Sequence, residues 1–114
     1  MLGLVMADPR DLLPLKPLVF QVLLALSDSP RHGWSLVREI QRHTGGEKIL
    51  PANFYRTLRA MLADGLIEDA PRADPARRDF RLTALGRTVA RLEAGRLYLL
   101  MNDARTRRLL RKEP

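Results

Sequence analysis

The chain has 114 residues and no cysteine, so it fits a single domain without disulfides, thiol chemistry or cysteine-bound zinc. It has no basic leader, and no stretch approaches the ~18 apolar residues of a membrane-spanning helix, so we expect a soluble, cytoplasmic protein that does not contact a membrane. The net charge is +7 at pH 7, and all of the excess lies in residues 71–114, which carry twelve basic and five acidic groups.

Two helices are expected in the first part of the chain. Pro17 suits a first helical turn, and the apolar run from Leu18 to Leu26 predicts a core helix. Between Gly33 and Thr44, apolar residues recur at helical spacing while charged residues lie opposite. That pattern predicts an amphipathic helix, which the following glycine pair would end.

The stretch NFYRTLRAMLADGLIED (53–69) predicts a third helix with an abrupt end. Pro51 suits its first turn, and Gly65 would stop it after about Ala63. The face opposite its apolar side is centred near Ala52, Arg56, Arg59 and Ala63, with Asn53 and Ala60 at the margin. Small residues there would let the helix enter a DNA major groove, where arginine suits guanine and asparagine suits adenine. The alternative is that both arginines are ordinary solvated residues.

After the third helix the pattern changes to that of short strands. Residues 66–69 and 78–82 flank a turn with two prolines, and in the second segment apolar residues alternate with charged ones. The two segments predict a small hairpin. Thr83 can cap a following helix, which we expect to run without a break from Ala84 to about Leu110.

This order of elements is that of a winged helix-turn-helix, with the third helix for recognition and the hairpin as the wing. We therefore expect a mainly α (α+β) fold: an N-terminal arm or short helix at 1–16, a DNA-binding winged helix-turn-helix at 17–83, and a dimerisation helix with a basic tail at 84–114. Seventeen of the twenty basic residues are arginine, which can grip a phosphate with two hydrogen bonds. The residues expected to contact double-stranded DNA are Ala52, Asn53, Tyr55, Arg56, Arg59, Arg72, Arg77, Arg78 and Arg81.

The apolar arc of the last helix is wider than one partner helix would cover, which predicts a homodimer. The residues expected at the dimer interface are Leu85, Val89, Leu92, Leu99 and Leu100. The alternative is that the arc packs on the chain's own N-terminal segment, whose apolar residues include Leu2, Leu4, Val5, Leu12 and Leu13. The two are compatible if the N-terminal residues join the dimer interface. The basic run after Asp103 is either a phosphate-contacting tail or a solubilising helix end.

Three ordered strings resemble the PadR family of bacterial winged-helix transcription regulators: RHGWSLVREI (31–40), NFYRTLRAML-DGLIED (53–69 with Ala63 omitted) and RRDFRLTALGR (77–87). The resemblance covers about residues 17–90. It implies a homodimeric repressor that binds a near-palindromic operator, dimerises through its C-terminal helix and, in some members, is released by a small-molecule effector. The single helix expected after the wing is the pattern of the short members.

Three residues depart from the family pattern. Trp34 and Phe80 stand where the family usually has tyrosine, and Arg56 stands where proline is frequent. Arg56 could therefore place a charged side chain for base recognition where relatives have a rigid turn.

No pattern predicts catalysis, a metal or a cofactor. His32 and His43 are eleven residues apart, and we find no carboxylate at helical spacing to complete a metal site. No serine lies in a nucleophile elbow, and no glycine loop resembles a phosphate cradle. We therefore do not expect an enzyme. The alternative to a DNA-binding repressor is a winged-helix module that binds another protein and uses its arginines only for solubility.

Overall fold

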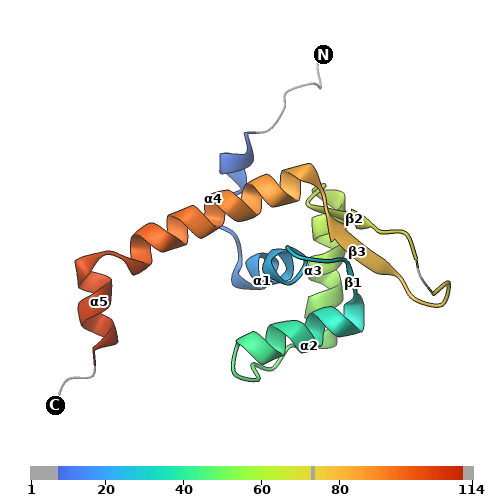
Figure 1. Ribbon diagram of the computed structural model, residues 1–114, viewed down its shortest axis with the longest axis horizontal. Coiled ribbons are helices and arrows are strands. Elements are labelled where there is room, and N and C mark those ends of the chain that lie inside the picture. The colour runs from blue at the N-terminus through green and yellow to red at the C-terminus, as the bar shows by residue number, and fades with distance from the viewer. Residues whose placement is uncertain (1–7, 73, 112–114) are drawn as a thin grey trace.

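The computed structural model describes residues 8–72 and 74–111. Its elements are η1 (Pro9–Leu12, a 3-10 turn), α1 (Pro17–Ala25), β1 (Arg31–His32), α2 (Gly33–His43), α3 (Pro51–Ala63), β2 (Ile67–Asp69), β3 (Asp79–Leu82), α4 (Ala84–Met101) and α5 (Ala104–Leu110) (Figure 1). The expected helices before the wing and the two wing strands match α1, α2, α3, β2 and β3 within one residue at each end. The mainly helical winged-helix fold is therefore confirmed. Leu2, Leu4, Val5 and Lys112 lie outside the described residues.

The core lies where α1, α2 and α3 meet the sheet and the start of α4. Apolar residues at helical spacing on α3 turn inward, and Phe54, Leu58 and Met61 are each almost completely buried. The other elements add Val22 and Leu23 from α1, Leu36 and Ile40 from α2, Phe80 and Leu82 from β3, and Val89 from α4. Burial of one face of α3 leaves its opposite face free for function.

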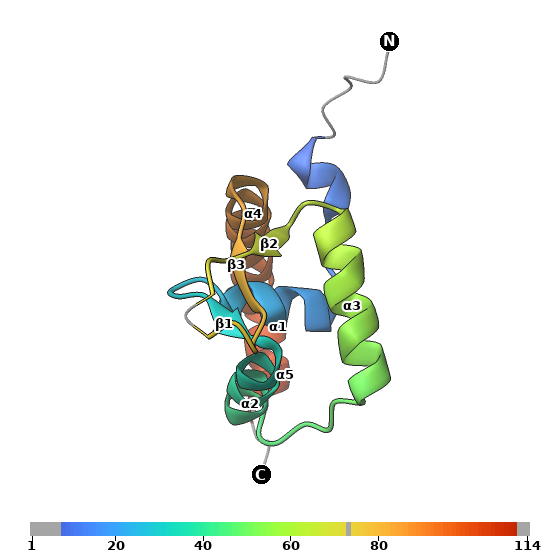
Figure 2. The same cartoon turned by 90° about the vertical axis from the view of Figure 1, so that its right-hand side faces the viewer.

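The sheet contains three antiparallel strands in the order β1-β3-β2. In the wing, Glu68 pairs with Arg81 and Ile67 pairs with Leu82. Arg31 of β1 pairs with Phe80 on the other edge of β3. We did not expect β1, because two residues are too few to show the alternation that marks a strand. Its pairing ties the start of α2 to the wing. Figure 2 shows the wing toward the viewer, with α2 below it and α3 to its right.

A tight junction joins α3, the wing and α4. Gly65 adopts a φ of 75°, which favours glycine and allows the sharp exit from α3. The Thr83 hydroxyl donates to the Gly65 carbonyl and accepts the Gly86 N–H at 2.9 Å. A Cβ atom on Gly86 would lie 1.9 Å from the Leu66 carbonyl oxygen, so only glycine fits there. The Thr-x-x-Gly spacing thus caps α4 and seats it on the turn.

The single helix expected from Ala84 to about Leu110 is wrong. The chain bends at Asn102 and Asp103 between α4 and α5. The Asn102 side chain donates to the Tyr98 carbonyl at 2.9 Å, and the Asp103 carboxylate accepts the Arg105 N–H at 2.8 Å. Such side chains compete with the helical backbone and favour helix ends. Two consecutive competitors outweigh the helical propensity of the residues around them.

α4 has two different surroundings along its length. Its first part packs against η1, α1 and β3, whereas its last turn and α5 project from the body of the molecule (Figure 1). Leu12 and Leu13 pack against the core, so the chain's own N-terminal segment covers part of the apolar arc. No helix among the described residues is long and apolar enough to cross a membrane.

Candidate nucleic-acid interface

The outward face of α3 carries two exposed arginines, Arg56 and Arg59. Neither forms an ion pair among the described residues. Ala52, Asn53 and Tyr55 are exposed on the same helix. The arrangement leaves guanidinium and amide groups accessible along one side of a regular helix. These groups can donate hydrogen bonds to base edges and to phosphates.

A groove lies on each side of α3. The first, here called the arm groove, has a volume of about 600 Å³ and separates α3 from the segment 12–19; Asn53 and Arg56 line it. The second, here called the wing groove, has a volume of about 350 Å³ and separates α3 from the start of α2 and the wing; Tyr55 and Arg59 line it. α3 therefore stands as a ridge with open space on both flanks.

The wing arginines are held by carboxylates of the same hairpin. Arg78 donates to Asp69 at 3.0 Å and lies over the Phe80 ring, 5.1 Å from its centroid, and Arg81 donates to Glu68 at 2.8 Å. The hydrogen bond from Arg78 lowers the pKa of Asp69 below its usual range, which keeps the pair ionised. These contacts commit two of the four wing arginines to partners within the chain.

The other two wing arginines are less tightly held. Arg77 lies 4.0 Å from the Asp74 carboxylate, and Arg72 donates to the Pro75 carbonyl at 3.3 Å. The segment 67–82 contains four arginines and four acidic residues, so its formal charge is 4 − 4 = 0. The wing is therefore less positive than its arginine content suggests.

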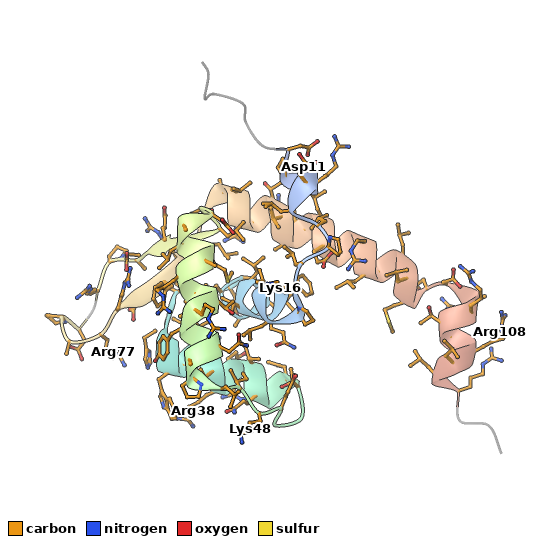
Figure 3. The ribbon with its side chains drawn as sticks, turned by 180° about the vertical axis from the view of Figure 1, so that it is seen from behind. Asp11, Lys16, Arg38, Lys48, Arg77 and Arg108 are labelled. Carbon is orange, nitrogen blue, oxygen red and sulfur yellow. The ribbon has the colours of Figure 1, made fainter. Side chains whose placement is uncertain are left out.

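Three basic residues around α3 were missed by the sequence reasoning. Lys16, Arg38 and Lys48 are exposed and form no ion pair among the described residues. Figure 3 shows them on the side where α3 lies in front, with Arg77 on the wing beyond. They come from three separate segments that precede α3 in the chain. No local pattern groups them, and only the tertiary fold brings them to one face.

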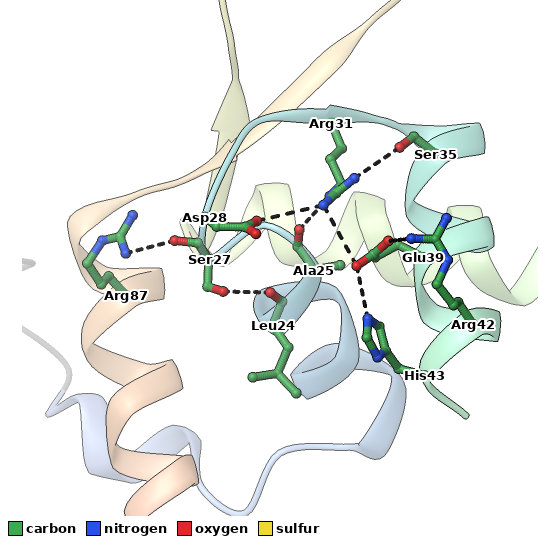
Figure 4. Close-up of polar contacts among 10 residues, drawn as sticks. All are labelled: Leu24, Ala25, Ser27, Asp28, Arg31, Ser35, Glu39, Arg42, His43 and Arg87. Atoms are coloured by element: carbon green, nitrogen blue, oxygen red, sulfur yellow. Dashed lines mark hydrogen bonds and ion pairs between the residues drawn. The ribbon is translucent and has the colours of Figure 1, made fainter. Parts of the chain in front are cut away.

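A polar cluster centred on the partly buried Arg31 and Glu39 positions α2 relative to α1 (Figure 4). Arg31 donates to the Ala25 carbonyl at the end of α1 at 2.7 Å and lies 3.8 Å from Glu39 of α2. Glu39 also accepts from Arg42 at 3.0 Å and contacts His43 at 3.1 Å. The cluster fixes the geometry of the two helices on which α3 packs.

Glu39 and His43 lie one turn apart on α2 and contact each other. Glu39 does lie at helical spacing from His43, so the sequence interpretation that no carboxylate accompanies the histidines is wrong. No group of three or more metal-ligating side chains is found in the described part of the chain, and Glu39 is engaged by Arg42 as well.

The residues expected at a dimer interface have different surroundings. Val89 has no exposed surface because it belongs to the core of this chain, and Leu85 is half-buried against that core. Leu92 is also half-buried. Leu99 is 72% exposed and Leu100 is 51% exposed. Further exposed apolar residues near them are Tyr98, Met101, Leu109 and Leu110.

Comparison with known proteins gives a family and a fold. Residues 22–94, more than half of the chain, match the transcriptional regulator PadR-like family. No curated protein sequence matches significantly. The fold is similar to that of RosR from H. salinarum, with 24% identity, a TM-score of 0.66, and coverage of 88% of this chain and 90% of that chain.

Two further solved structures share the fold. A PadR family transcription regulator from hypervirulent Clostridium difficile is 16% identical with a TM-score of 0.63, covering 76% of this chain and 96% of that chain. A transcriptional regulator from Clostridium thermocellum is 16% identical with a TM-score of 0.61, covering 73% and 84%. At these identities the similarity shows the fold alone.

Proposed function

The chain belongs to the PadR-like family of transcriptional regulators, and on that premise we propose that it is a repressor that binds a near-palindromic DNA operator as a homodimer. Membership of a regulator family also confirms that the chain is not an enzyme. The proposal concerns three finer points: sequence-specific recognition by α3, the homodimer, and repression.

The observation that carries the proposal is the ridge formed by α3. A B-DNA major groove is about 12 Å wide and admits one α-helix, while the two phosphate backbones rise on either side of it. The arm groove and the wing groove give those backbones room beside α3. Arg56 points its charge outward without a carboxylate partner in the described residues, which suits a hydrogen bond to guanine.

The homodimer is supported by apolar surface that the single chain leaves uncovered. Tyr98, Leu99, Leu100 and Met101 are all at least half exposed on the last turn of α4. Monomeric proteins rarely expose large apolar surfaces, and a second copy would cover these side chains. A two-fold dimer would place two α3 helices on half-sites about one DNA turn, roughly 34 Å, apart.

Selection of bound sequences from random duplex DNA tests specificity and symmetry together. We expect an enriched site with two inverted half-sites, and an affinity that falls with salt at a log-log slope of about −0.9 per phosphate contacted. Repression is then tested by placing the enriched site across a promoter and measuring reporter transcription with and without the protein. A rise in transcription would refute repression, and a flat salt response would refute recognition of DNA by this face.

The neutral, ion-paired wing is the observation that favours the alternative, a winged-helix module that binds another protein. Such a module would not enrich any sequence from the random pool. The selection experiment therefore separates the two functions directly.

A further inference from the structure

We propose that the wing groove seats one phosphodiester of the DNA backbone with its deoxyribose, Arg59 and Arg77 contacting the phosphate and Trp34 packing on the sugar. The inference rests on the proposed function, since it places operator DNA against α3. It adds a residue, Trp34, that lies outside the recognition helix and the wing.

Three elements converge on the wing groove. Its lining includes His32 of β1 next to Trp34 at the start of α2, Tyr55 and Arg59 from α3, and Arg77 from the wing. Leu58, Leu62 and Phe80 form apolar parts of the lining. A backbone nucleotide unit has an anionic phosphate and a largely apolar sugar face. A groove with cations and apolar surface side by side is complementary to both.

The charge of the lining separates this groove from the other two cavities. Among the residues that the structure describes, no acidic one lines the wing groove, whereas Asp64 lines the arm groove, and Asp28 and Glu39 line the cavity between α1 and α2. Of the three arginines that line the wing groove, Arg78 is tightly paired with Asp69. The other guanidiniums are available to an anion, and a guanidinium fork matches a phosphate with two hydrogen bonds.

Trp34 is unusually exposed for its type. Trp34 is 64% exposed at the start of α2, and Tyr55, which also lines the groove, is 49% exposed. Large aromatic side chains at the surface commonly mark a binding site, because they offer apolar area together with a polar group at little entropic cost. Stacking on a sugar would cover the Trp34 ring. Contacts of this kind hold the register of a protein on DNA without reading its sequence.

Trp34 is the only tryptophan of the chain, so its fluorescence reports on this groove alone. We would titrate the wild-type protein with the selected operator duplex and with a random duplex of equal length, following both Trp34 emission and the anisotropy of a dye on the DNA. Both duplexes should change Trp34 emission over the same concentration range in which anisotropy rises.

Two substitutions assign the contacts. Trp34→Ala should weaken the operator and the random duplex by the same factor, roughly 3- to 10-fold, while Trp34→Phe keeps most of the affinity. Arg77→Gln should reduce the salt slope by about 0.9, as expected for one lost phosphate contact. Arg91→Gln is the control, because Arg91 is an exposed arginine of α4 that does not line the groove, and its slope should stay at the wild-type value. Circular dichroism checks each fold.

The outcomes distinguish this inference from the function on which it rests. If anisotropy shows binding while Trp34 emission stays constant and Arg77→Gln keeps the wild-type salt slope, the phosphodiester site in the wing groove is refuted. The proposed repressor function is not affected by that result. A loss confined to the operator duplex in Trp34→Ala would also refute it, because a sugar contact does not depend on sequence. If neither duplex binds at all, both proposals fail together.

Discussion

At the scale of single residues, arginines at different positions have different roles because their neighbours differ. Arg78 and Arg81 are bound by Asp69 and Glu68 across the wing strands, so a phosphate would have to compete with a carboxylate already in place. Arg56 has no such partner in the described residues and lies at the edge of the arm groove. Availability, rather than count, therefore separates Arg56 and Arg59 from the paired wing arginines, and Arg56 is the one proposed for base recognition.

Replacing Arg56 with alanine should weaken binding to the selected operator by about 1–3 kcal/mol and barely change binding to random DNA, because a lost base contact acts on one sequence only. Arg91→Ala removes the same charge from an exposed position on α4 and is the control. Fluorescence anisotropy at one salt concentration measures both. An equal loss on the two duplexes would show that Arg56 contacts a phosphate instead.

Gly86 is a second residue whose role depends on its surroundings. We expect Gly86→Ala to lower the free energy of unfolding by roughly 3 kcal/mol or more, because its Cβ would overlap the Leu66 carbonyl oxygen, a backbone atom that cannot move away alone. Gly95→Ala, also in α4 and with open space around its Cβ, should instead stabilise by up to about 1 kcal/mol. Urea unfolding compares the two. Similar effects of both substitutions would contradict the proposed close contact.

At the scale of elements, one carboxylate connects the N-terminal segment to α4. Glu93 is 1% exposed; it accepts the Leu15 N–H at 2.9 Å and a hydrogen bond from Arg96 at 3.1 Å. The segment fixed in this way forms one wall of the arm groove. By holding the N-terminal segment in place, Glu93 of α4 therefore helps to shape the arm groove beside α3.

The contribution of Glu93 to stability should depend on pH. The Arg96 hydrogen bond, helped by the Leu15 N–H, lowers the pKa of Glu93 from its ordinary value of 4.5. A lowered folded-state pKa stabilises the fold above about pH 4.5, and that stabilisation is lost as the pH falls through the folded-state pKa. Glu93→Gln should therefore cost about 1–3 kcal/mol at pH 7, with the difference from wild type shrinking below pH 4.5.

Urea unfolding at several pH values measures this difference. Glu47→Gln is the control, because Glu47 is exposed and its carboxylate forms no ion pair among the described residues; it should change stability by less than about 0.5 kcal/mol throughout. A cost for Glu93→Gln that stays constant from pH 7 to pH 3 would rule out the ionised hydrogen-bonded carboxylate as the cause.

At the scale of the whole molecule, the part of α4 beyond the core determines the geometry of the proposed dimer. The molecule extends 55 × 40 × 25 Å because the end of α4 and α5 project from its body (Figure 1). The bend at Asn102 and Asp103 changes the direction of the chain beside the exposed residues. A dimer built on this end would therefore differ from one built on a straight helix.

Leu99→Glu should convert the proposed dimer to a monomer without loss of helix content, because Leu99 is 72% exposed and contributes little to the core of its own chain. This substitution is a cleaner test than Leu92→Glu, since Leu92 is half-buried within the single chain. Leu50→Glu, at an exposed position before α3, is the control and should keep the wild-type mass. Sedimentation equilibrium gives the masses. An unchanged mass for Leu99→Glu would contradict the proposed interface.

Much of the fold could be predicted from the sequence because local signals agreed. Prolines at the first turn of α1 and α3 and the Thr83 cap of α4 placed the starts of these helices, and the glycine after α3 placed its end, within one residue. Helical and strand periodicities then assigned the faces of α3 and the wing, including the outward position of Arg56. These features depend on neighbours a few residues apart, which a sequence displays directly.

Only the tertiary structure decided which of those side chains are available. Val89 looked like interface from its spacing but lies in the core, because α1 and β3 cover that side of α4. Arg78 and Arg81 looked free but are paired across the wing strands. Lys16, Arg38 and Trp34 come from distant segments and lie around α3. Periodicity determines which face a residue occupies, whereas long-range packing determines what that face meets.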